Sequence, residues 1–279
     1  MGLGVVGSGV ARALLERGEA YGRQLGCPLR LVRILEREPD RERPVQVDRA
    51  LFTQDVRDII DNPDIDVVIE VLGGEHPAYE YQQQALAAGK YVVTANKEVI
   101  AKHGADLRAL AHEHSVDILY EASVGGGIPI IAPLKRDLLA NEITAISAII
   151  NGTTNYILTS MSREGSDFEP ALRRAQELGY AEANPANDIE GMDAVYKLAI
   201  LASLAFHADV YPEDVYREGI TRLSARDFRY ARELGYAIKL LALARKHESR
   251  LQVRVHPALL HEDELLAKVD GVLNAGVVR

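Results

Sequence analysis

The sequence predicts an α/β protein of two domains: a Rossmann-type dinucleotide-binding domain, with its first strand largely missing, followed by an α+β domain. A glycine-rich motif stands at the start of the chain, and β-like runs then alternate with helical patterns. Such alternation is typical of a parallel sheet with helices on its faces. Three glycines and Pro129 mark a boundary. We therefore expect domains over residues 1–126 and 127–279.

The glycine motif is G-x-G-x-x-G, formed by Gly2, Gly4 and Gly7 ahead of an amphipathic helical pattern. In dinucleotide-binding folds such glycines allow a tight turn and close approach to the pyrophosphate, which rests on the helix N-terminus. The usual strand before the motif has no residues upstream of Met1, so we expect neighbouring strands to lose hydrogen-bond partners. The predicted cofactor-binding residues in this segment are Gly2, Gly4, Val5, Val6 and Gly7.

The remaining elements follow from composition and periodicity. In the first domain we expect strands at 29–35, 65–72 and 91–94 and helices at 76–88 and 98–114. Pro129 should begin a helix in the second domain. Further along we expect strands at 143–150, 251–255 and 271–278, and helices directly after Gly152 and at 168–178, 192–206 and 225–247.

Residues 180–197 say more about function than any other stretch of the chain. Four carboxylates, those of Glu182, Asp188, Glu190 and Asp193, crowd a loop that leads into an apolar helix with a single Lys197. Asp193 and Lys197 are four residues apart, so they share a helix face. A solvated surface pair is the alternative, but a lysine at the entry of a buried helix is costly unless it is paired or used. We interpret the stretch as a site.

Composition restricts the class of protein. The net charge of −9 disfavours a nucleic-acid partner. No apolar run reaches the ~18 residues of a membrane helix, so we expect no membrane partner. A single cysteine, Cys27, fits a reducing compartment, and we expect a cytoplasmic protein.

Six segments together resemble homoserine dehydrogenases. They are Gly-Leu-Gly-Val-Val-Gly-Ser-Gly-Val (2–10), Thr-Ala-Asn-Lys (94–97), Glu-Ala-Ser-Val-Gly-Gly-Gly-Ile-Pro (121–129), Ile-Asn-Gly-Thr-Thr-Asn-Tyr-Ile-Leu (150–158), Leu-Gly-Tyr-Ala-Glu-Ala-Asn-Pro (178–185) and Asp-Ile-Glu-Gly-Met-Asp-Ala-Val-Tyr-Lys (188–197). The resemblance implies NAD(P)-dependent interconversion of L-aspartate 4-semialdehyde and L-homoserine, a step in threonine, methionine and isoleucine biosynthesis.

We assign roles on this basis. Lys197 is the expected proton donor, with Asp193 holding it charged and oriented, because hydride attack on an aldehyde develops negative charge on oxygen. Lys97 would reach the same oxygen or the nicotinamide. Glu182 would pair with the substrate ammonium, and Asp188 would share that role or bind the hydroxyl side. The resemblance also implies a sodium ion held by Glu121, Val124, Gly126 and Ile128, largely through main-chain carbonyls.

Cofactor choice depends on Arg37, which follows the predicted strand at 29–35. An acid at this place would bind the ribose hydroxyls of NAD, whereas an arginine accommodates the 2′-phosphate of NADP. Alternation puts Glu36 and Glu38 on one side and Arg37 on the other. We expect NADP, with NAD as the alternative.

The sequence also departs from the family. Asn184 stands where aspartate is common, and the chain stops at Arg279, before a segment that normally covers the cofactor, so we expect a C-terminally truncated domain. A homologue that dimerises without efficient turnover therefore stays open, as does another Rossmann enzyme acting on an amino or imino acid. We expect a homodimer, because the runs at 143–150 and 271–278 carry few charges and would expose apolar edges unless the helices at 154–161 and 192–206 cover them.

Overall fold

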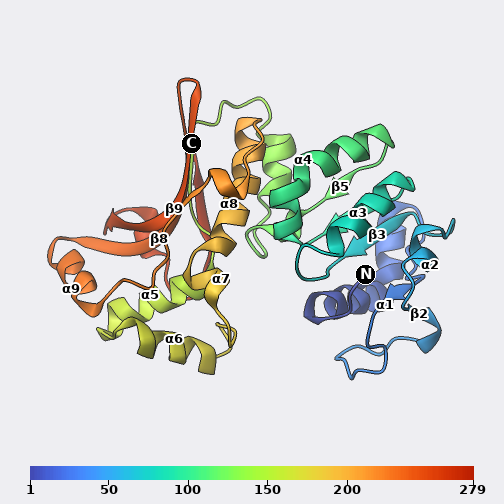
Figure 1. The fold of residues 1–279 in the computed structure, drawn as a ribbon, viewed down its shortest axis with the longest axis horizontal. Helices are drawn as coiled ribbons and strands as arrows, with labels where there is room; N and C mark the ends of the chain where they lie inside the picture. The colour runs from blue at the N-terminus through green and yellow to red at the C-terminus, as the bar shows by residue number, and fades with distance from the viewer. The chain divides into compact units, whose positions relative to one another are not determined.

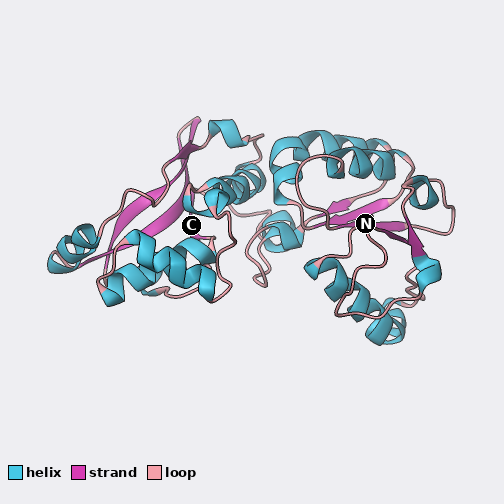
Figure 2. Ribbon diagram, turned by 60° about the horizontal axis from the view of Figure 1, so that its bottom comes forward, coloured by secondary structure: helices cyan, strands magenta, loops and turns pink.

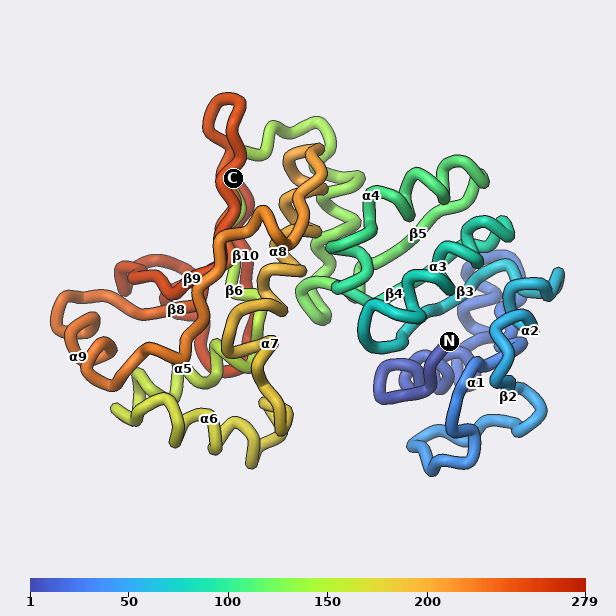
Figure 3. Tube along the Cα trace, in the orientation of Figure 1, coloured from blue at the N-terminus to red at the C-terminus, as the bar shows by residue number.

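The structure is a computed structural model that describes all 279 residues. The chain folds as two units, Met1–Ser123 and Val124–Arg279. The colour passes from the first unit to the second in the green part of Figure 1, and Figure 3 traces the same path as a tube. Each unit has its own strands and its own cluster of buried apolar side chains. None of the helices is long and apolar enough to span a lipid bilayer.

The first unit has short parallel strands with helices on both sides of them (Figure 2). Its helices are α1 (Val5–Leu25), α2 (Arg57–Ile60), α3 (Ala78–Ala87) and α4 (Lys97–Glu113), with 3-10 turns η1 (Arg49–Leu51) and η2 (Glu121–Ser123). Its strands are β1 (Ile34–Leu35), β2 (Phe52–Thr53), β3 (Val67–Glu70), β4 (Tyr91–Thr94) and β5 (Ile118–Leu119). The β1–β2 pair and the order β3-β4-β5 are parallel throughout, which confirms the predicted α/β class.

Met1 and Gly2 connect these two sets of strands through their backbone atoms. The Met1 nitrogen donates to the carbonyl of Ile69 at 2.6 Å, and its carbonyl accepts from Val71 N–H at 3.0 Å. On the other side, Gly2 N–H donates to the carbonyl of Leu35 at 3.0 Å. The start of the glycine motif therefore lies between β1 and β3, where its backbone joins the sheet.

Only the end of the predicted strand at 29–35 is a strand. Residues 34–35 pair with β2, whereas the segment before them has no ladder partner. A cavity of about 320 Å³ lies beside this segment and is lined on its other side by residues 64–69. The other two predicted strands of this unit are present as β3 and β4, and the two predicted helices as α3 and α4.

A buried carboxylate ends β3. Glu70 is 0 % exposed, and its oxygens accept hydrogen bonds from Leu72 N–H at 2.6 Å, Gln82 at 2.5 Å and Thr94 at 2.8 Å. A buried charge is tolerated when donors surround it in this way. Glu70 therefore fixes the turn between β3 and Gly73.

The second unit is an α+β arrangement around one five-stranded sheet. Its helical elements are the π-helical turn η3 (Pro133–Asp137), α5 (Gly152–Glu164), α6 (Phe168–Glu177), α7 (Ala186–Ile189), α8 (Met192–Phe206), η4 (Pro212–Asp214), α9 (Ala225–Glu233) and η5 (Leu265–Lys268). Its strands are β6 (Ala145–Ile149), β7 (Tyr216–Arg217), β8 (Tyr236–His247), β9 (Arg250–His261) and β10 (Ala275–Val278). The sheet order is β10-β6-β8-β9-β7, antiparallel except for the β7–β9 pair.

The predicted helix at 225–247 is wrong in its second half. Helix α9 ends before Gly235, which adopts the left-handed region at φ 80°, and the chain then forms β8. Residues 238–244 of this strand are all buried, because both faces of the sheet are covered. A strand buried on both faces reads as a continuous apolar run, which periodicity cannot separate from a buried helix.

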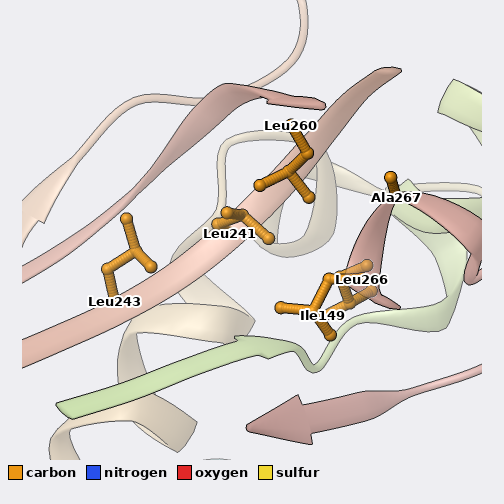
Figure 4. Close-up of a cluster of buried hydrophobic side chains, with 6 residues drawn as sticks. All are labelled: Ile149, Leu241, Leu243, Leu260, Leu266 and Ala267. Carbon is orange, nitrogen blue, oxygen red and sulfur yellow. The ribbon is translucent and has the colours of Figure 1, made fainter. Parts of the chain in front are cut away.

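The apolar core of the second unit forms on both sides of β8. One cluster, drawn in Figure 4, joins β6, β8 and β9 to the turn η5 and consists of Ile149, Leu241, Leu243, Leu260, Leu266 and Ala267. Helix α8 contacts β8 and β9 and is buried along most of its length, as its nearly all-round apolar pattern predicts.

Strand β6 is not the uncovered strand on which the dimer expectation was based. It lies between β10 and β8, and Ile146 and Ile149 are each 2 % exposed within the single chain. Helices and the turn η5 therefore already bury this run. The edge strand is β10, which begins at Ala275 and so starts four residues later than the predicted strand at 271–278.

Candidate active site

Helix α8 places two ionisable side chains at the edge of a buried region. Gly191 precedes the helix at φ 81°, and it lies close to β9, because an added Cβ would be 3.4 Å from the Val255 side chain. Asp193 falls in the first turn, where the helix dipole favours an acid. One turn later comes Lys197. Their side chains are 5 % and 15 % exposed, so the surface-pair alternative does not describe them.

The Lys197 ammonium is held by two acceptors. Its Nζ donates to Asp193 Oδ2 at 2.6 Å and to the backbone carbonyl of Ile150 at 2.8 Å. An ammonium has three N–H donors. The arrangement therefore leaves one N–H of Lys197 without a partner in the chain, in a side chain that cannot easily turn away.

Asn151 joins two of the predicted carboxylates. Its side-chain NH₂ donates to Asp188 Oδ1 at 2.7 Å and to Asp193 Oδ2 at 2.8 Å. No sequence pattern predicted this place in the site for Asn151. An asparagine directly before a helix that begins Gly-Thr-Thr has the pattern of an N-cap residue. The partners of its NH₂ group, however, are set by tertiary contacts.

Glu182 is not part of this cluster. It lies in the exposed loop between α6 and α7, and its carboxylate makes no hydrogen bond within the chain. Its backbone carbonyl accepts from Gln176 at 3.1 Å, which fixes the loop at that point. The structure thus brings together Asp188, Asp193 and Lys197 and leaves the Glu182 carboxylate available.

The glycine loop of the first unit has the shape that a dinucleotide needs. Gly2 adopts φ 85°, a turn conformation that favours glycine. A Cβ on Gly7 would lie 2.2 Å from the Gly2 carbonyl oxygen, so the close contact between the helix and the loop requires glycine there. Gly4 differs, because an added Cβ would meet no protein atom within 4 Å. Nothing in the chain requires glycine there, whereas close approach by a phosphate group does.

The N-terminus of α1 is open to an anion. Gly4 is its N-cap residue, and no side chain caps the first N–H groups. Val5 and Val6 follow and are 92 % and 54 % exposed, which is unusual for valines at the start of a 21-residue helix. The uncapped N–H groups and the dipole suit a pyrophosphate, and the exposed valines suit contact with the rest of a cofactor.

Arg37 borders a cavity of about 290 Å³ that also includes Gly2 and Gly73 in its lining. Its guanidinium is exposed and makes no hydrogen bond within the chain, while its carbonyl accepts from Gln54 at 2.7 Å. A larger hollow of about 920 Å³ continues past Arg37 and is lined also by Arg41 and Arg49. The border of the hollow is mixed in charge, because Glu38 and Asp40 also line it and Asp40 pairs with Arg49 at 3.0 Å.

The acid before Arg37 is already used inside the protein. Glu36 accepts hydrogen bonds from Leu3 N–H at 2.9 Å and Glu38 N–H at 3.2 Å, and Arg43 lies 3.3 Å away. Partial burial acts to raise the pKa of Glu36, but these two N–H donors and the guanidinium outweigh it and lower that pKa. Glu36 therefore holds the glycine loop, and both Glu36 and Arg37 line the cavity.

Lys97 is the first residue of α4 and is half-buried. The helix start is fixed by Asn96, whose Oδ1 accepts from Val99 N–H at 3.2 Å and whose NH₂ donates to the Gly74 carbonyl at 2.8 Å. Gly74 belongs to the turn that follows β3. The hydrogen bond from Asn96 to Gly74 therefore holds Lys97, the next residue, close to the turn that borders the nucleotide cavity.

The residues expected at a sodium ion lie in and after the turn η2. Glu121 is in the first unit, whereas Val124, Gly126 and Ile128 begin the second. Gly125 and Gly126 adopt φ 80° and 59°, and Ile128 N–H donates to the Gly125 carbonyl at 3.0 Å. This hydrogen bond uses a carbonyl that is not among the expected sodium ligands.

The first unit has a parallel sheet with an open glycine loop, and the second has a lysine–aspartate site. These features define a class, that of two-domain proteins that bind a dinucleotide. Family models identify the class further: residues 2–121 match "Homoserine dehydrogenase, NAD binding domain", and residues 129–279 match "Homoserine dehydrogenase". The chain belongs to the homoserine dehydrogenase family.

Individual relatives agree with the family models. The chain is 43 % identical to a homoserine dehydrogenase of Bacillus subtilis over 99 % of its length and 47 % identical to one of Synechocystis over 100 %. It covers 64 % and 65 % of those two proteins, less than two thirds of their length. A solved homoserine dehydrogenase of Thiobacillus denitrificans, of which the chain covers 64 %, superposes over the whole chain with a TM-score of 0.92 at 45 % identity.

A second solved relative carries a cofactor. A hyperthermophilic archaeal homoserine dehydrogenase, solved in complex with NADPH, matches 82 % of this chain and 66 % of its own length, with a TM-score of 0.70 and 33 % identity. Together with the NAD-binding family model, this likeness supports a nicotinamide nucleotide as the cofactor class of the first unit.

Proposed function

We propose that the chain is a homoserine dehydrogenase that interconverts L-aspartate 4-semialdehyde and L-homoserine with NADP as cofactor. The observation that carries this proposal is the Lys197 ammonium, fixed by Asp193 and the Ile150 carbonyl with one N–H left over. Family membership supplies the reaction class, and the open glycine loop supplies the place for the nucleotide.

The chemistry requires control of one oxygen atom. A bound nicotinamide nucleotide supplies the hydride to the aldehyde carbon in the reducing direction and accepts it in the other. The remaining N–H of Lys197 donates to the aldehyde oxygen, so that its proton neutralises the negative charge that develops there. Asp193 holds the ammonium in place for this transfer, because its carboxylate accepts a hydrogen bond from Lys197 Nζ at 2.6 Å. Burial of the pair strengthens both effects.

Substrate binding would use the carboxylate oxygens that are not bonded within the Asp193–Lys197 cluster. Asp188 has one oxygen without a partner in the chain, and the Glu182 carboxylate is wholly available. We propose that Glu182 binds the substrate ammonium and that Asp188 shares this role or binds the hydroxyl side. Lys97, contributed by the first unit, would act on the same oxygen or beside the nicotinamide.

The cofactor preference rests on Arg37. Its exposed guanidinium borders the nucleotide cavity, whereas Glu36 is already bonded to the glycine loop. A 2′-phosphate would therefore meet a cation whose N–H donors are not used within the chain. This supports NADP over NAD.

We also propose a sodium ion at Glu121, Val124, Gly126 and Ile128. The positive φ angles of Gly125 and Gly126 support it, because glycine in this conformation permits a tight turn whose backbone can approach a ligand closely. Isothermal titration with sodium against potassium tests this, and equal weak heats for both ions would reject the site.

We propose a homodimer formed by the second unit and a cytoplasmic location. Strand β10 is an open sheet edge, and Leu259, Val272 and Leu273 are exposed on the same unit. The exposed, unpaired Cys27 suits a reducing compartment. Sedimentation decides the first point, since a single species near the chain mass of 30.6 kDa would reject the dimer.

The function is tested by incubating the purified chain with NADPH and L-aspartate 4-semialdehyde and identifying the product by mass spectrometry. We expect homoserine in amounts equal to the NADPH consumed. Turnover of an imino acid instead would favour another Rossmann oxidoreductase. NADPH binding without any product would favour the alternative of a homologue that dimerises without efficient turnover.

A further inference from the structure

Asn151 lies where three parts of the candidate active site meet. It ends the chain segment after β6, caps α5, and is 6 % exposed. Its backbone has extended dihedral angles, φ −129° and ψ 113°, as expected of an N-cap residue. The preceding residue, Ile150, supplies the carbonyl that binds Lys197. One turn of chain therefore touches the lysine, the helix start and both aspartates.

The orientation of the Asn151 carboxamide is fixed by its surroundings. Its Oδ1 accepts from Thr154 N–H at 2.8 Å and from the Thr154 hydroxyl at 2.9 Å. A backbone N–H can only donate, so the oxygen must face it, and the NH₂ must face the two carboxylates. A flipped amide would bring donor against donor and oxygen against oxygen. All four hydrogen bonds that the side chain can make are thus formed.

The NH₂ group keeps two acids close together without adding charge. Asp188 Oδ1 and Asp193 Oδ2 lie 2.7 Å and 2.8 Å from the same nitrogen atom, although they belong to the separate helices α7 and α8. Two carboxylates at such short range repel each other. The two N–H donors of one neutral amide reduce this repulsion, because each carboxylate accepts one of them.

We propose that Asn151 is a positioning residue of this active site, whose carboxamide holds the carboxylates of Asp188 and Asp193 in register with Lys197. The expected effect on turnover rests on the proposed function, whereas the positioning of the two aspartates rests on the geometry alone. Asp193 then stays in contact with Lys197, and the second oxygen of Asp188 stays directed away from Asn151, where a cationic or hydroxyl group of an amino-acid substrate can reach it.

The substitution Asn151→Asp isolates this role. Aspartate has the same shape and is a good N-cap, so α5 keeps its cap. It removes both N–H donors and places a third carboxylate beside the two aspartates. We expect kcat to fall at least ~10²-fold, as for loss of a positioned proton donor, and the acid limb of the pH profile to move to higher pH. The melting temperature and the NADPH affinity of the first unit should change little.

Asn151→Ser is the matched control, because serine caps the helix and adds no charge. We expect a smaller fall in kcat and an acid limb at its wild-type position. Wild-type kcat and pH profile in Asn151→Asp would overturn the proposal. If Asn151→Asp does not fold, Asn151→Ser carries the test, and wild-type kcat in that variant would overturn it equally.

A second measurement does not depend on turnover. The acylation rate of Lys197 by acetic anhydride, measured by peptide mass spectrometry against that of exposed Lys246, reports the fraction of neutral amine. The added carboxylate in Asn151→Asp should slow acylation at Lys197 and leave Lys246 unchanged, and equal rates at Lys197 in both proteins would overturn the positioning role. A wild-type chain without homoserine production would reject the proposed function alone, because the labelling result would still decide the role of Asn151.

Discussion

Lys197 differs from a surface lysine because both of its contacts are fixed by buried partners. Asp193 is on the same helix, and the Ile150 carbonyl is held by the β6–α5 turn. Arg37, by contrast, has a free guanidinium beside a cavity. Both are cations, and we propose proton transfer as the role of the first and binding of a ligand anion as the role of the second.

Arg37→Ala should weaken NADPH binding much more than NADH binding. The lost contact is a charge-assisted hydrogen bond to the 2′-phosphate, which NADH lacks. Fluorescence titration with both nucleotides measures the two dissociation constants. Arg17→Ala, on the exposed face of α1, serves as the control and should leave both unchanged. An equal loss of affinity for NADPH and NADH in Arg37→Ala would show that this residue does not bind the phosphate.

At the level of elements, the segment between η5 and β10 is tied to α5 and β8 by buried polar contacts. Lys239 on β8 is 3 % exposed and binds Asp270 Oδ1 at 2.8 Å and the Val269 carbonyl at 2.6 Å. From α5, Arg163 binds the other Asp270 oxygen at 2.6 Å, and Asn155 donates to the Val269 carbonyl at 3.1 Å. This network orders the chain that leads into the edge strand.

Asp270→Asn should destabilise the fold in a pH-dependent way. Burial acts to raise the pKa of Asp270, but Lys239 and Arg163 outweigh it and lower that pKa below its ordinary value of 3.8. A depressed carboxyl pKa adds stability above the unfolded value, and this stability is lost as the pH falls through the folded one. The variant removes the carboxylate that binds Lys239, so urea unfolding at neutral pH should give a free energy of unfolding about 1–3 kcal/mol lower than that of the wild type. This difference should become smaller below pH 3.8. A deficit independent of pH would contradict this.

Gly152 shows a second contact of the same segment. A Cβ at this position would lie 2.8 Å from the Val272 carbonyl oxygen, which is closer than real Cβ atoms approach. Gly152→Ala should lower the free energy of unfolding by about 1–3 kcal/mol through overpacking. The control is Gly9→Ala within α1, where a Cβ would meet nothing within 4 Å. That variant should be stabilised by about 0.5–1 kcal/mol, because alanine is the better helix former. Similar effects at both positions would reject the contact.

The elements that sequence reasoning predicted well are those with strong local signals. Helix α8 has the predicted bounds, and β4 coincides with the predicted strand, because apolar pattern and neighbouring turns act within a few residues of each. The prediction was wrong for β8, because burial on both faces removes the alternation of apolar and polar residues that marks a strand. Asn151 was missed for a related reason: its bonds to Asp188 and Asp193 join residues 37 and 42 positions away. No local pattern records such pairings.

For the whole molecule, the two units carry separate parts of one proposed reaction. The first has the nucleotide loop, Arg37 and Lys97, and the second has Asp188, Asp193 and Lys197. Fold, family models and relatives agree on the class along nearly the whole chain. The chain nevertheless spans 64 % of the Bacillus subtilis relative, so its own turnover is the point to be measured.

The most direct test compares NADPH consumption with L-aspartate 4-semialdehyde in the wild-type chain and in Lys197→Met, which keeps the apolar stem and removes the ammonium. We predict homoserine formation by the wild-type chain and a loss of kcat of ~10²–10⁴-fold in the variant, with NADPH affinity unchanged. Lys246→Met, at a lysine that is 44 % exposed on β8, should behave as wild type. A Lys197→Met variant with wild-type kcat would contradict the account, because its central claim is that this ammonium donates the proton.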